Sequence, residues 1–154
     1  MAIDQAMCTS FKKQILLGVH RLGSNAHDTF KLALYTSSAT LGATTTAFPT
    51  TNEVSNSGSY SSGGGTLDSA NAVSSSSTTA FADFDNINFT SATITARGAL
   101  IYNSTPSATS ESGATLTNPA CVVLNFGSDK TSTSGTFTIQ FPANDSSNAI
   151  IRIA

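Results

Sequence analysis

Apolar and polar residues alternate along several stretches of the chain from position 30 onward, in the period-two pattern of strands that bury one face. The clearest stretch is 135–141, in which Phe137, Ile139 and Phe141 alternate with polar residues. Phe30–Tyr35 has the same pattern, and similar stretches predict strands at 80–89, 92–102, 120–126 and 148–153. Glycine, proline and serine mark 103–119 and 127–134 as connections between strands.

The segment 1–23 differs, because its apolar residues recur at the spacing of a helix. The repeating positions are Phe11, Ile15 and Val19, with Leu16 and Leu22 beside them. Thr9 or Ser10 is a suitable N-cap, and Gly23 a suitable end, for a helix of about ten residues. We therefore expect one mainly β domain over 1–154, a β-sandwich or jelly-roll-like fold with one short N-terminal helix.

A long segment rich in Ser, Thr and Gly, 36–79, interrupts the strand pattern. Short strands are expected near 52–54 and 65–69, and the rest is predicted to form a long arm or loop. Three apolar residues, Phe48, Val54 and Tyr60, are spaced about six positions apart along it. Such isolated residues on a polar segment can anchor a partner, or they can pack beneath the segment itself.

The alternation also predicts the core, because residues two apart on a strand share a face. The expected core residues are Phe30, Leu32, Leu34, Ile94, Leu100, Val122, Leu124, Phe137, Ile139 and Phe141.

Hydroxyl residues replace charged ones in this chain. Ser and Thr contribute 24 and 23 of the 154 residues, and charged residues make up only 10%, against about 25% in ordinary domains. The hydrophobic share of 39% suffices for a core, and the net charge is −2. With no basic run, no apolar stretch of membrane-spanning length and no secretory signal, we expect neither nucleic-acid nor membrane partners and synthesis in a cytoplasm.

Few residues are candidates for chemistry, and we expect no catalytic, cofactor or metal site. His20 and His27 lack further ligands at a familiar spacing, so they are interpreted as a helix-end and a loop histidine. Asp83 and Asp85 would share one face of a strand, where a carboxylate pair or a solvated face would both fit. The two cysteines, Cys8 and Cys121, are expected to be buried and reduced, with a bridge or a reactive thiol as alternatives.

Two arginines stand within otherwise apolar strand stretches. Arg97 and Arg152 are interpreted as outward-facing edge charges or, alternatively, as members of an ion pair at a subunit interface. Together with Phe48, Val54 and Tyr60, they are the candidate partner-contact residues.

Several passages together resemble a known class of proteins. They are FKLALYTSSATL at 30–41, TTNEV at 50–54, ITARGALIYN at 94–103, and the closing FPAND and NAIIRI. This combination resembles the small virion structural proteins of tailed bacteriophages and cyanophages, over most of the chain from Phe11 to Ile153.

The resemblance implies a non-enzymatic role in the virion, after synthesis in the cytoplasm of a host bacterium. A capsid decoration or cement protein is the first expectation, which would bind the major capsid protein or another virion protein as a homotrimer or other symmetric homo-oligomer. The alternatives are a tail, neck or fibre-base component, and a host-surface or carbohydrate-binding module.

Overall fold

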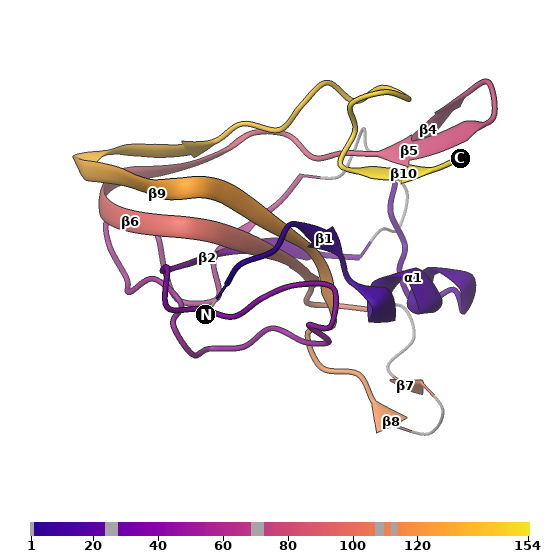
Figure 1. Cartoon of the computed structure of the whole chain (residues 1–154), viewed down its shortest axis with the longest axis horizontal. Helices are drawn as coiled ribbons and strands as arrows, with labels where there is room; N and C mark the ends of the chain where they lie inside the picture. Colours follow the sequence, from indigo (N-terminus) through magenta and orange to yellow (C-terminus); the bar gives the residue numbers. More distant parts are fainter. Residues whose placement is uncertain (1, 24–27, 69–72, 107–109, 112–113) are drawn as a thin grey trace.

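The computed structural model describes residues 2–23, 28–68, 73–106, 110–111 and 114–154, and contains two main antiparallel sheets and one helix. The larger sheet has the strand order β1-β9-β6-β2-β3, and its bounds are β1 Ala6–Met7, β2 Phe30–Tyr35, β3 Gly65–Thr66, β6 Ile87–Asn103 and β9 Ala120–Ile139. The smaller sheet has the order β10-β5-β4, with β4 Val73–Ser76, β5 Thr79–Ala82 and β10 Ile151–Ile153. A hairpin of β7 Ser110–Glu111 and β8 Ala114–Thr115 projects beside helix α1, Thr9–Leu16 (Figure 1). The prediction of a mainly β, sandwich-like fold with one short helix is confirmed.

Two long strands, β6 and β9, form the centre of the molecule. They pair from Ile87↔Ile139 to Tyr102↔Ala120, and Figure 1 shows them running together to one end and bending back. The register shifts at four places, including Phe89/Ala92 and Ala96/Gly98, and each such bulge bends the ribbon. Both strands belong to the larger sheet, and the bend brings their returning arms to the side of the molecule where the smaller sheet lies (Figure 1).

The predicted strand boundaries are wrong at two places and right at a third. The stretch 127–134 is not a connection but lies inside β9, with Lys130, Thr131 and Ser132 paired to β6. The predicted strand 80–89 is divided, because β5 ends at Ala82 and β6 begins at Ile87. Phe30–Tyr35 is a strand with the predicted bounds.

The helix, Thr9–Leu16, begins and ends earlier than expected. Its N-cap is Cys8, without a side-chain cap bond, so the prediction of a Thr9 or Ser10 cap is wrong. Gly18, at φ +70°, ends it: the Gly18 amide donates to the Ile15 carbonyl (3.1 Å) and the Val19 amide to the Gln14 carbonyl (3.0 Å). These two bonds form a Schellman motif, so the helix ends before Gly23.

The core contains the predicted residues except Leu124 and Phe141, which are half-buried. It also extends to the second face of β2, where Ala33 and Tyr35 are fully buried. The cover on that side is the segment predicted as an arm or loop. Its Val54 amide donates to the Leu34 carbonyl (2.8 Å), and β3 pairs with Lys31 and Leu32. Residues 36–68 are thus packed along the larger sheet, whereas Val73–Ser76, at the end of the predicted arm, form the exposed strand β4 of the smaller sheet.

Candidate functional site

The predicted anchors Val54 and Tyr60 are buried in the chain's own core, at 7% and 1% exposure. The Tyr60 hydroxyl accepts a hydrogen bond from the Leu34 amide (2.9 Å) and donates to Glu53 Oε1 (2.9 Å). Burial and the nearby Glu53 carboxylate raise the pKa of Tyr60. Phe48 is half-buried and stacks on Tyr102, with ring centroids 4.6 Å apart. Of the two interpretations, packing beneath the segment fits the buried Val54 and Tyr60, whereas a partner contact at half-buried Phe48 stays a prediction.

A second buried polar group holds the helix against the sheet. Asn103, fully buried at the end of β6, donates from Nδ2 to Asp28 Oδ2 (2.7 Å) and lies 2.9 Å from His20 Nδ1. His20 Nε2 lies 2.9 Å from Gln14 Oε1, an arrangement satisfied by a neutral ring that carries its proton on Nε2. Burial lowers the pKa of His20 from 6.5 to about 4, although Asp28 opposes the shift. His20 is therefore a neutral structural brace, and His27 lies outside the described residues.

The carboxylates Asp83 and Asp85 are not a strand pair. They lie in the crossing between β5 and β6, where Asp83 is buried at 3% exposure and Asp85 is exposed. Asp83 accepts bonds from the amides of Phe84 (2.9 Å) and Ile150 (3.3 Å), which ties the C-terminal segment to the crossing. Burial raises the pKa of Asp83 despite these bonds. The expectation that the two carboxylates share one face is wrong.

Both arginines have partners within the chain. Arg97 Nε lies 2.7 Å from Asp129 Oδ1 in an exposed cross-strand ion pair. Arg152 donates from Nη1 to the Ser147 carbonyl (2.6 Å). Of the two interpretations, the outward-facing one fits Arg97, whose side chain is 36% exposed.

The two cysteines are free thiols, and both are fully buried. The Cys8 amide donates to the Cys121 carbonyl (2.9 Å), which extends the β1–β9 ladder. Burial raises the pKa of Cys8 to about 11 and that of Cys121 well above its usual range. Such thiols are poor nucleophiles at neutral pH.

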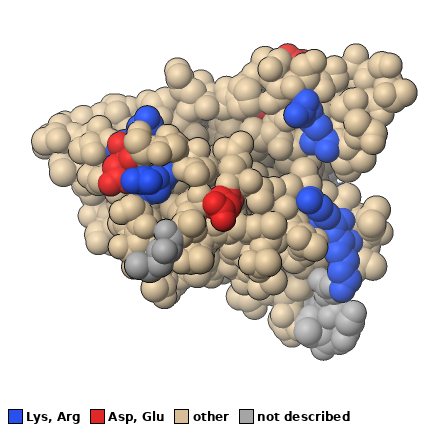
Figure 2. All heavy atoms as spheres, viewed as in Figure 1, with Lys and Arg blue, Asp and Glu red and all other residues tan. Residues whose placement is uncertain are grey.

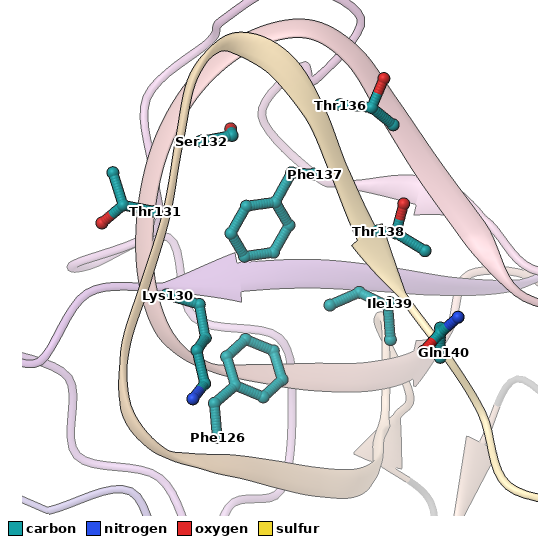
Figure 3. A pocket seen from close by; sticks show the side chains of 9 residues that line it. All are labelled: Phe126, Lys130, Thr131, Ser132, Thr136, Phe137, Thr138, Ile139 and Gln140. Atoms are coloured by element: carbon teal, nitrogen blue, oxygen red, sulfur yellow. The ribbon is translucent and has the colours of Figure 1, made fainter.

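An open cleft lies inside the bend of β9, bordered by exposed polar groups. Its larger part, of about 610 Å³, is lined by β9 and Gln140 (Figure 3). Phe126, Phe137 and Ile139 point into the bend, and the two phenyl rings have centroids 6.5 Å apart. A second part of about 400 Å³ shares Phe126, Ile139 and Gln140 and continues past β1 to Arg152. We call these two adjoining hollows the β9 cleft.

Polar groups border the β9 cleft without an acidic lining residue. Thr136, Thr138 and Gln140 are exposed beside its larger part, and Lys130 also lines it. Lys130 and Arg152 are the charged side chains among the described lining residues. Figure 2 shows how sparse charge is elsewhere, with small separate groups on a surface that is mostly uncharged.

Sequence reasoning missed Phe126 and Lys130 as neighbours of Phe137. Lys130 lies in the stretch interpreted as a connection, and only the bend of β9 brings it and Phe126 near Phe137. The alternation Thr136, Phe137, Thr138, Ile139 did indicate which face of that arm is apolar.

Within the residues that the structure describes, no three His, Cys, Asp or Glu side chains converge as a metal site requires. No helix in the described part of the chain is long and apolar enough to cross a membrane. Comparisons with family models, with curated proteins and with solved structures return no match to this chain.

Proposed function

We propose that this chain is a non-enzymatic structural protein of a tailed-bacteriophage virion, and that it acts as a capsid decoration or cement protein. In this role a symmetric homo-oligomer, such as a trimer, binds the major capsid protein on the assembled head. The chain would be made in the host bacterial cytoplasm and would function in the virion. The sequence resemblance suggests the class of protein, and the β9 cleft is the observation that carries the contact role.

The buried hydrogen bonds between distant segments support a role as a rigid binding domain. Glu53 and Tyr60 fasten the covering segment to β2, while Asp28 and Asn103 fasten the region after the helix to β6. Each brace joins residues far apart in the chain and leaves the bend of β9 uncovered. A rigid domain loses little conformational entropy when it binds, so repeated contacts of modest area can stabilise a shell.

The direct test is to measure this chain in density-purified virions of the virus that encodes it. Quantitative mass spectrometry against the major capsid protein should find hundreds of copies per particle. A small copy number fixed by tail symmetry would move the chain to the tail or neck. Absence from purified particles would refute the virion role altogether.

A further inference from the structure

The edge of β9 that faces away from β6 has, in the part of the chain that the structure describes, a strand partner along only a short part of its length. Within the described residues, the strand paired to that edge is β1, and only Ala6 and Met7 pair there, with Val123 and Val122. Asn125 bonds the Ile3 carbonyl (2.7 Å), and beyond it the edge continues to Ile139 beside the β9 cleft. Strand edges present backbone amides and carbonyls that a further strand can pair with.

The shape of the cleft fits an extended peptide segment. Phe137 and Ile139 stand two residues apart on one arm of β9 and point into the bend (Figure 3). Two residues of a strand span about 6.6–6.8 Å, so alternate side chains of an added strand would meet these two positions in turn. β1 already occupies the beginning of the same edge in this manner, as an antiparallel strand.

The charges around the cleft indicate the chemistry of that segment. Lys130 lies in the larger part and Arg152 in the smaller part, and the described lining contains no carboxylate. Asp129, next to Lys130 in the sequence, is paired with Arg97. Asp145 accepts from Asn148 and the Ser147 amide and also interacts electrostatically with Arg152, so Lys130 carries most of the charge argument. A ligand with carboxylates along an extended backbone would therefore meet complementary charge.

We propose that the β9 cleft is the docking site for an extended acidic segment of a partner protein, added as a strand to the free edge of β9. Apolar side chains of the segment would alternate with carboxylates, the former packing on half-buried Phe126 and on the small exposed parts of Phe137 and Ile139. This inference rests on the proposed function, since it specifies how the domain would hold a capsid subunit.

The experiment uses the whole chain and two short labelled peptides, one of alternating valine and glutamate and one of alternating valine and lysine. Fluorescence polarisation measures binding, and hydrogen exchange of the β9 amides locates it. Phe126→Ala removes a half-buried ring that points into the bend, and Phe48→Ala is its matched control, a half-buried ring stacked on Tyr102 outside the cleft. Lys130→Gln removes the cleft ammonium, and Lys12→Gln on α1 is its control.

We expect the glutamate peptide to bind at least about tenfold more tightly than the lysine peptide, with slower exchange at residues 136–140. Phe126→Ala should weaken binding by about tenfold or more, Lys130→Gln should reduce the preference for glutamate, and both controls should bind as the unmodified chain does.

Equal binding of both peptides, no binding, or binding insensitive to Phe126→Ala would overturn the proposal. A uronic-acid oligosaccharide that binds in place of the peptide, and is weakened by Phe126→Ala, would overturn it in favour of a carbohydrate site. The copy number in virions is measured independently. Failure of peptide binding with many copies present refutes this docking site alone, whereas peptide binding without any copies refutes only the proposed virion role.

Discussion

Replacing Tyr60 by Phe tests whether the segment after β2 is a fixed cover of the sheet. The substitution keeps the ring, which packs against Phe89 with centroids 4.9 Å apart, and removes only the hydroxyl. The Leu34 amide then loses its 2.9 Å acceptor inside the core, and Glu53 loses a 2.9 Å donor but keeps the Gly63 amide. The substitution therefore tests two hydrogen bonds, from the Leu34 amide to Tyr60 and from Tyr60 to Glu53.

The expected loss is dominated by the buried amide. An unsatisfied buried donor costs about 1–3 kcal/mol, and the lost bond to a carboxylate adds to this, so we expect the free energy of unfolding to fall by about 2–3 kcal/mol. For a domain of this size each kcal/mol shifts Tm by about 2–4 °C, which gives a fall of about 4–12 °C.

Circular dichroism with thermal and urea unfolding measures both quantities. Tyr102→Phe is the matched control, because it removes one bond to the Gly63 carbonyl (2.7 Å) without leaving a buried amide unsatisfied. It should cost less than Tyr60→Phe. If Tyr60→Phe unfolds like the unmodified chain, the hydroxyl does not hold the segment, and the segment would be free to act as the arm that the sequence suggested.

Three further predictions address the helix brace, a close backbone contact and the core. The pKa of His20 is about 4 in the folded chain against an ordinary 6.5, so the neutral ring contributes stability above pH 6.5 that is lost as the pH falls towards 4. An NMR titration of the ring measures this pKa, and a midpoint near 6.5 would contradict the prediction. Gly64→Ala places a Cβ on the Leu32 carbonyl, so the fall in Tm should be several times that of Gly127→Ala. Gly127 has a similar φ of +75° with open space around it, so its substitution should cost only about 1–2 kcal/mol of backbone strain. Phe137→Ala should cost about 3–5 kcal/mol in urea unfolding, and an unchanged midpoint would show that its ring is not part of the core.

Local patterns were sufficient for the strands that bury one face and insufficient where distant segments meet. Alternation placed β2 correctly, since Leu32 and Leu34 occupy one face. It did not show that Ala33 and Tyr35 are also buried, because the cover on their side comes from residues later in the chain. Tyr35 donates to the Pro49 carbonyl (2.6 Å), a contact that no short window of sequence contains.

The candidate site was missed for a related reason. Serine, threonine and glycine favour connections, and on that basis 127–134 was interpreted as one. Bulges allow the same residues to continue a strand, with Ser134 at φ +48° within the paired region of β9. Because the bend is produced by register shifts between two strands, neither strand's own sequence predicts the hollow that it encloses.

The two edges of the larger sheet differ in a way that bears on the docking proposal. One edge ends in β3, which has only two residues, Gly65 and Thr66, and so offers little backbone for a further strand to pair with. The other edge, β9, is long but strongly bent, and it carries Lys130 near the bend. Curvature and an edge lysine both oppose the flat, extended pairing that leads to aggregation. A short segment avoids the curvature because it lies along only one arm of the bend, and its carboxylates make the edge lysine favourable. The features that oppose pairing with other copies of the chain would therefore also select the proposed partner.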